Sequence, residues 1–280
     1  MMLVRLSGVL ACSKKIVEGV CCLVFLSSCA STSAEPLLTK QASVAQINAL
    51  YQTVLERHVY TEVKNGLPAN MVRYGDLATD ADFKQVRVWL AHYSKEALVT
   101  QSQQLAFYLN AYNILAMEKV AQNWPLKSLR GLGNFLVPVW THGAGKLCGE
   151  DMTLRILEHE ILRSLGDPRI HFALNCASMS CPDLRFEPYA ADRIDAQLDE
   201  QSRIFLTQLR KGIQVTKNEV VLSPLFDWFD EDFEAGGGVQ RFVEKYAPVG
   251  LLPANWEIDD YLNYDWSVNA IFTPAEKRKL

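Results

Sequence analysis

The spacing of apolar residues along the chain predicts several amphipathic helices. Between residues 44 and 55, apolar side chains recur every three or four positions, which places them on one face of a helix. Thr79-Asp80-Ala81-Asp82 resembles a capping box, the pattern that begins many helices. The same periodicity predicts further helices at about residues 80–93, 102–123, 153–166, 194–209 and 239–246.

Shorter apolar segments predict strands between these helices. Residues 213–222 contain two short apolar runs separated by Lys217-Asn218, which predicts a hairpin. We predict a buried strand at Ile170–Leu174, loop and short strand at Gly131–Gly149, and extended chain at 256–266. Because helices and strands mix without strict alternation, the expected fold class is α+β, with one domain over residues 42–280.

The first residues have the pattern of a secretory signal. A basic segment precedes an apolar run at residues 19–26, and Ser27-Ser28-Cys29-Ala30 follows. The run is shorter than the ~20 residues of a membrane-spanning helix. Leu26-Ser27-Ser28-Cys29 resembles a bacterial lipobox, in which the cysteine is acylated.

This resemblance implies a signal peptide at residues 1–28, lipidation at Cys29 and a tether at 29–41. The membrane is then the expected partner, through that lipid. Because Ala30 stands where an inner-membrane retention signal has aspartate, we expect an outer-membrane lipoprotein that faces the periplasm. The alternatives are an ordinary cleaved signal, or a cytosolic protein with an apolar start.

Composition excludes several classes of protein. The chain has 280 residues, of which 49% are hydrophobic, so it is not disordered throughout. A net charge of −4 and the lack of a basic stripe argue against nucleic acid as a partner. Of seven cysteines, removal of the signal and acylation of Cys29 leave three as thiols: Cys148, Cys176 and Cys181.

Polar residues interrupt two of the predicted apolar helix faces. Asn110 and Asn113 lie among apolar residues of the helix at 102–123, so both amides should be buried and hydrogen-bonded. They either brace neighbouring loops or bind a substrate. Glu158 lies beside the apolar stripe of the next helix. It either forms an ion pair, with Arg169 or Arg185, or acts as an acid, a base or an orienting group for a histidine.

The stretch from Asp167 to Pro182 carries the densest chemistry. In the strand predicted there, His171, Ala173 and Asn175 share one face, and the strand leads into a loop of small residues with two cysteines. Cys176 is a candidate nucleophile, with His171 as its base, and His159 or His142 as the substitutes.

Two other interpretations of the same residues stay open. Cys176 and Cys181 could form a disulfide that closes a small loop, which an oxidising periplasm favours. A histidine and both cysteines, with Cys148 or His142, could instead bind zinc. Their spacing matches no standard zinc finger, so we expect no metal and no cofactor.

These residues resemble the domain-of-unknown-function family 547. The resemblance covers about residues 80–270, and its most specific part runs from His171 to Cys176. The matching segments are Asn110-Ala111-Tyr112-Asn113, Leu157-Glu158-His159 with Leu162-Arg163, Asp167 to Cys176, Cys181-Pro182, Phe226 to Phe229 with Asp232-Phe233, and Tyr264 to Asn269. The family's activity is uncharacterised, but some eukaryotic relatives are joined to glutaredoxin-like modules, which favours thiol chemistry. A remote likeness to papain-like or transglutaminase-like cysteine enzymes is an analogy only.

Two functions are therefore expected from the sequence. The first is a thiol-dependent hydrolase or acyl transferase with Cys176 as nucleophile, His171 or His159 as base, and Glu158 or Asn175 as the orienting group. In it, the substrate-binding candidates are Asn110, Asn113 and Arg169. The second is a non-catalytic envelope binding or scaffold protein, in which a Cys176–Cys181 disulfide is structural.

Overall fold

The helices of the N-terminal half begin at the caps that their sequences provide. The computed structural model describes residues 41–280 apart from 65, 134–137 and 218. Helix α1 (Val44–His58) starts with a capping box of Ser43 and Gln46, and α4 (Gln101–Gln122) with one of Thr100 and Gln103. Helix α3 (Ala81–Ala91) is capped by Asp80. The helices predicted over these three regions are confirmed.

The strands form three small sheets. Strands β1 (Val59–Lys64) and β2 (Leu67–Val72) form one antiparallel hairpin, and β3 (Gly143–Leu147) and β4 (Glu150–Thr153) form another. The third sheet joins β5 (Ile213–Val215) and β6 (Val220–Leu222) antiparallel, with β7 (Asp260–Tyr261) parallel to β6. The mixed content confirms the α+β class, and the hairpin predicted at 213–222 is confirmed.

The remaining elements are helices, many of them short. Three of them bring site residues into place: η4 (Ile156–Leu162), η5 (Arg163–Leu165) and η6 (Pro168–Phe172). The others are α2 (Tyr74–Leu77), η1 (Lys95–Ala97), η2 (Leu129–Leu132), η3 (Val139–Thr141), α5 (Ile194–Thr207), α6 (Leu225–Trp228), η7 (Asp230–Gly236), α7 (Gly238–Tyr246) and α8 (Pro274–Lys277).

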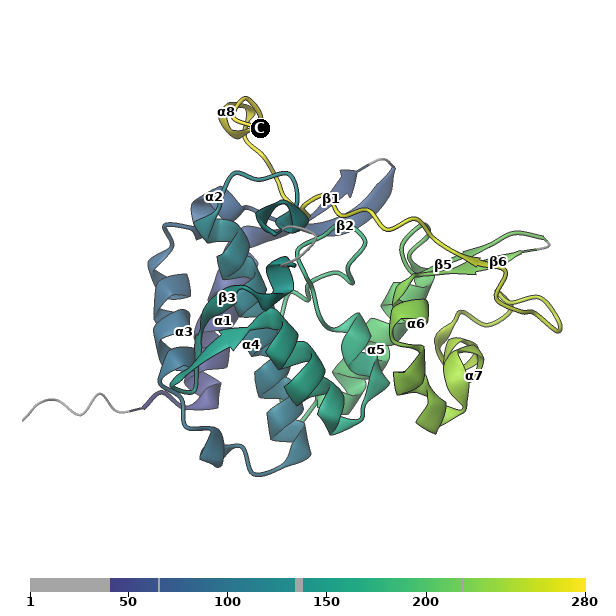
Figure 1. Ribbon diagram of the computed structural model, residues 1–280, viewed down its shortest axis with the longest axis horizontal. Coiled ribbons are helices and arrows are strands. Elements are labelled where there is room, and N and C mark those ends of the chain that lie inside the picture. The colour runs from purple at the N-terminus through teal and green to yellow at the C-terminus, as the bar shows by residue number, and fades with distance from the viewer. Residues whose placement is uncertain (1–40, 65, 134–137, 218) are drawn as a thin grey trace, which may run out of the picture. The chain divides into compact units, whose positions relative to one another are not determined.

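Residues 41–280 form one compact unit with two hydrophobic cores. The larger core surrounds α4, which is buried on nearly all sides and packs with α2, α3, α5, β3 and η4 (Figure 1). The smaller core is rich in phenylalanine and lies among α5, α6 and α7, on the green side of Figure 1. Segment η6 joins the two cores, because Ile170 packs in the larger one and Phe172 in the smaller one.

The strand predicted at Ile170–Leu174 is wrong. Residues 168–172 form the 3₁₀ helix η6, because the Asp167 side chain accepts a hydrogen bond from the Arg169 amide and Pro168 occupies the first helical turn. His171 therefore does not share a strand face with Asn175. The β1–β2 hairpin is not predicted by the apolar pattern of the sequence.

The predicted signal peptide, the lipidation site at Cys29 and the tether at 29–41 concern a region that, apart from residue 41, lies outside the described residues. Within the described part of the chain, none of the helices has the length and apolar character needed to cross a membrane.

Candidate functional site

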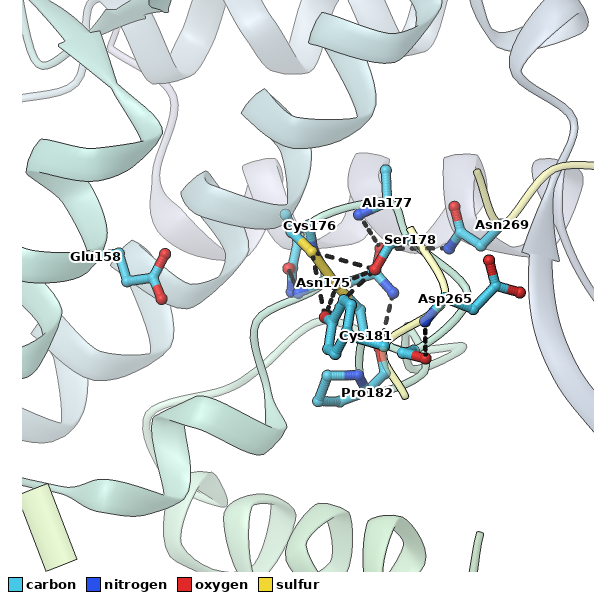
Figure 2. Close-up of a disulfide and its surroundings, with 12 residues drawn as sticks. Glu158, Asn175, Cys176, Ala177, Ser178, Cys181, Pro182, Asp265 and Asn269 are labelled. Atoms are coloured by element: carbon cyan, nitrogen blue, oxygen red, sulfur yellow. Dashed lines mark hydrogen bonds between the residues drawn. A yellow bond between two sulfur atoms is a disulfide. The ribbon is translucent and has the colours of Figure 1, made fainter. Parts of the chain in front are cut away.

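The cysteine loop directly follows η6. A disulfide joins Cys176 and Cys181 and closes the loop, with 6.1 Å between their Cα atoms (Figure 2). Asn175 organises the inside of this loop: its Oδ1 accepts from the Ala177 amide at 2.9 Å, and its Nδ2 donates to the Pro182 carbonyl at 2.7 Å. Asn175 is buried, and both its side-chain oxygen and its side-chain nitrogen hydrogen-bond to the backbone of the loop, as in a structural residue.

Helix α4 holds the loop through the two asparagines that we expected to be buried. Asn113 Oδ1 accepts from the Asn175 amide at 2.8 Å, and Asn113 Nδ2 donates to the Ala173 carbonyl at 3.0 Å. Asn110 makes the equivalent pair with the backbone of Tyr189, at 2.9 and 2.8 Å. Both side chains are buried, as predicted. Both asparagines bind the backbone of neighbouring loops, which is the first of the two roles expected for them.

The segment that precedes the cysteine loop is fixed by Arg169. Its guanidinium forms ion pairs with Asp167, Asp195 and Asp199 at 2.6 to 2.8 Å. These pairs tie η6 to α5. Arg169, Asn110 and Asn113, the three substrate-binding candidates, do not line the cavity beside the disulfide within the described residues.

The two sulfur atoms have different surroundings. Cys181 is 2% exposed, and its sulfur accepts from the Cys176 amide at 3.0 Å. The hydroxyls of Ser178 and Tyr264 each lie 3.2 Å from the same sulfur, closer than their 3.5 and 3.7 Å distances to the Cys176 sulfur. The two hydroxyls lie 3.3 Å from one another. Burial raises the pKa of Tyr264, so its hydroxyl keeps its proton and remains a donor. Cys176 is only partly buried, and it lines the cavity.

The cavity has a volume of about 140 Å³ and takes its walls from both cores. Cys176, Glu158, His159 and His171, all predicted as site residues, line it together. The other lining residues are largely aromatic: Tyr112, Trp140, Trp228, Phe229, Tyr264 and Trp266, with Arg155, Leu174, Cys181, Pro182 and Leu225. The structure thus brings these four predicted residues to one site.

Glu158 lies on a π-helical turn, η4, where the Arg163 amide donates to the Glu158 carbonyl five residues earlier. Such turns are rare and occur often at functional sites. Glu158 Oε2 accepts from the Tyr112 hydroxyl at 3.1 Å. Burial raises the pKa of Glu158 to about 7, although Tyr112 and Arg163 act in the opposite direction. Figure 2 shows its carboxylate turned toward the disulfide.

The two histidines pair with charged residues and not with Cys176. His171 Nε2 lies 2.7 Å from Asp232 Oδ2, and its ring stacks on Phe229 at 4.0 Å. Arg163 donates to Asp232 at 2.7 Å and to His159 Nδ1 at 3.1 Å. A guanidinium can only donate, so His159 is neutral with its proton on Nε2. Burial lowers the pKa of both histidines, assisted by the charge of Arg163.

These contacts do not assemble the nucleophile–base pair expected from the sequence. Within the described residues, no hydrogen bond joins either imidazole to Cys176. Asp232 pairs with His171, and the Tyr264 hydroxyl lies next to both sulfurs. Neither residue was predicted to belong to the site. Their only signal was their place in the segments that resemble the family.

Neither the zinc interpretation nor a resident cofactor gains support from the geometry. Among the residues that the structure describes, no three histidine, cysteine, aspartate or glutamate side chains gather as a metal site. Cys148 lies in the β3–β4 turn, apart from the residues that line the cavity.

Comparisons with known proteins agree with the resemblance seen in the sequence. None of the curated proteins and none of the solved structures matches the chain. Residues 97–206 match the model of one family, and this segment contains Glu158, His171 and both cysteines of the disulfide. Asp232, Tyr264 and the tryptophans Trp228 and Trp266 lie beyond it. The segment from η1 to α5, which builds most of this site, is thus similar to the family described as a protein of unknown function, DUF547.

Proposed function

We propose that this protein exchanges thiols and disulfides at the Cys176–Cys181 pair. The observation that carries the proposal is the asymmetry of the two sulfurs. Both cysteines line the cavity, but Cys176 is partly exposed, whereas Cys181 is 2% exposed and its sulfur lies next to an amide and two hydroxyls. Exchange requires one sulfur that is accessible to attack and one that leaves as a stabilised thiolate.

The reaction follows from these positions. An incoming thiolate attacks the Cys176 sulfur, the bond between the cysteines breaks, and a new disulfide joins Cys176 to the substrate. The electron pair leaves on the Cys181 sulfur, where the Cys176 amide and the Tyr264 hydroxyl stabilise the thiolate. A second thiolate then attacks the substrate's sulfur, so Cys176 leaves as a thiolate. Two substrate thiols become one disulfide, and the protein disulfide becomes a dithiol.

The other two functions expected from the sequence make different demands. A hydrolase or acyl transferase requires a free Cys176 thiolate with a base hydrogen-bonded to it, but Cys176 is in a disulfide and, within the described residues, neither His171 nor His159 hydrogen-bonds to its sulfur. A purely structural disulfide needs no cavity beside it. The cavity and the Cys181 environment therefore favour exchange.

We propose the cell envelope as the place of this chemistry. The support is the sequence at residues 1–30, which has the pattern of a signal peptide ending at a lipobox with Cys29. An acylated Cys29 would attach the protein to the outer membrane, facing the periplasm. Disulfides persist in that oxidising compartment.

The test compares two single-substitution variants of the full-length protein, Cys181→Ser and Cys176→Ser. After reduction, each is mixed with glutathione disulfide, and the mixed disulfide is quantified by mass spectrometry. We expect Cys181→Ser to form it at Cys176 about tenfold faster than Cys176→Ser forms it at Cys181, because Cys176 is partly exposed and Cys181 is buried. Cys148→Ser, a control outside the site, should behave like the wild type.

Two results would reject exchange. In one, the folded wild-type protein keeps its disulfide in millimolar dithiothreitol, as a structural disulfide would. In the other, the two variants react equally. If the reduced protein instead forms an acyl adduct at Cys176 with activated esters and hydrolyses it, the hydrolase interpretation is the better one.

A further inference from the structure

The cavity beside the disulfide has aromatic walls. Trp228 stacks on Trp266 with 5.7 Å between ring centroids, and Tyr264 lies 4.4 Å from Trp266. Trp140 lies 6.2 Å from Trp266, and the Arg130 guanidinium already lies over the Trp266 ring, 4.7 Å from its centroid. Aromatic faces carry negative electrostatic potential and attract cations, above all when the site excludes water.

Glu158 forms no ion pair within the described residues, and its pKa of about 7 leaves it ionised in about half of the molecules at neutral pH. Among the described residues that line the cavity, it is the only acidic one. The cationic side chain of Arg155 has its own partner, since it binds Glu160 at 2.7 Å. Glu158 Oε2 accepts from a neutral hydroxyl, that of Tyr112, and within the described chain Oε1 has no hydrogen-bond partner.

We propose that the cavity recognises an alkylammonium group, so that the substrates of the exchange are small aminothiols and their disulfides. The inference rests on the proposed exchange function and names its substrate class. The ammonium would lie against the Glu158 carboxylate and the faces of Trp140 and Trp228, with the substrate's sulfur at Cys176. A volume of about 140 Å³ admits a molecule of this size or one short chain end, but not a folded polypeptide.

The aminothiol also suits the chemistry of the first step. Its ammonium lowers the pKa of the neighbouring thiol, so more of the molecule is thiolate at neutral pH. In the oxidising direction, the Cys176 thiolate attacks one sulfur of the diamine disulfide cystamine, and one aminothiolate leaves. The Cys181 thiolate then attacks the Cys176 sulfur, the protein disulfide forms again, and the second aminothiolate leaves.

The experiment measures how fast the reduced full-length protein is oxidised by disulfides that differ mainly in charge. The probes are cystamine, the neutral hydroxyethyl disulfide and the anionic dithiodiglycolate. Each rate is divided by the rate of the same probe with free glutathione, which removes differences in intrinsic reactivity. We expect the corrected rate with cystamine to exceed that with hydroxyethyl disulfide about tenfold, as a charge-assisted contact gives, and dithiodiglycolate to be slowest.

The variants assign this preference to the cavity. Glu158→Gln keeps the shape of the side chain and removes its charge, so the preference for cystamine should fall close to one. Glu244→Gln, an exposed residue of α7, removes the same charge elsewhere and should keep the preference. If Glu158→Gln does not fold, Trp228→Leu replaces it, because Trp228 is 45% exposed and its loss opens the aromatic wall.

The outcomes separate the two proposals. Equal corrected rates for cystamine and hydroxyethyl disulfide overturn the recognition of ammonium but leave exchange intact. A preference for cystamine that persists in both Glu158→Gln and Trp228→Leu also overturns the recognition of ammonium and leaves exchange intact. No oxidation by any of the three probes overturns exchange itself.

Discussion

Asn113 is the side chain through which α4 holds the loop that carries the disulfide. It accepts from the Asn175 amide at 2.8 Å and donates to the Ala173 carbonyl at 3.0 Å, and it is 4% exposed. Asn113→Ala removes both partners at once. A backbone N–H and a backbone C=O are then left buried directly before Cys176.

The expected cost follows from these two groups. Leaving one buried polar group without a partner costs about 1–3 kcal/mol. Two such groups predict a loss of roughly 2–4 kcal/mol in the free energy of unfolding, because water that enters the space left by the side chain recovers part of the sum. Domains are commonly stable by about 5–15 kcal/mol, so the variant should still fold.

Urea unfolding of the oxidised full-length protein, followed by tryptophan fluorescence, measures this loss. The matched control is Asn123→Ala at the end of the same helix, where the side chain makes one local bond, to the Lys119 carbonyl. We expect the control to lose less than about 1 kcal/mol. We also expect dithiothreitol to reduce the disulfide faster in Asn113→Ala. If Asn113→Ala costs no more than Asn123→Ala, α4 does not brace the loop in the way described.

Three further predictions concern stability and reactivity outside the site. Burial alone would raise the pKa of Asp80, but hydrogen bonds, first from His58, lower it to about 2, below the unfolded value of about 4. The ionised Asp80 therefore stabilises the fold above about pH 4, and this stabilisation is lost as the pH falls toward 2. In urea unfolding at several pH values, Asp80→Asn should lower the free energy of unfolding by roughly 2 kcal/mol at pH 7, and that free energy should fall less steeply in acid than in the wild type. Gly212→Ala should cost more than about 2 kcal/mol in urea, since its Cβ would lie 1.8 Å from a backbone oxygen, whereas Gly131→Ala meets nothing within 4 Å. Burial raises the pKa of Cys148 to about 11, so peptide mapping after iodoacetamide treatment at pH 8 should show it alkylated roughly a hundredfold more slowly than an unperturbed cysteine.

The helices and the buried asparagines could be predicted from the sequence because their signals are local. Apolar spacing and capping residues define α1 and α4 within a few positions. Asn110 and Asn113 were placed on the buried face by helical geometry alone, and both are buried. What their amides bind is not local, since Tyr189 lies 79 residues after Asn110.

The strand wrongly predicted at Ile170–Leu174 also reflects contacts that are not local in the sequence. The short, mostly apolar run Ile170–Leu174 is compatible with a buried strand, but Asp167 and Pro168 begin a 3₁₀ helix there. The choice between these structures also depends on the tertiary contact of His171 with Asp232, 61 residues later. No periodicity in the sequence reports a contact across that separation.

The site also depends on a long separation along the chain. Tyr264, whose hydroxyl contacts the Cys181 sulfur, is added to the growing chain 83 residues after Cys181. The same C-terminal segment binds the cysteine loop through its backbone, from the Met179 amide to the Ser267 carbonyl and from the Asn269 amide to the Ala177 carbonyl. A growing chain therefore carries both cysteines before it carries the phenol that stabilises one of them. The order of synthesis makes maturation of the site a late, post-translational event, and any chain cut short before Tyr264 would retain the thiols without the environment that controls them.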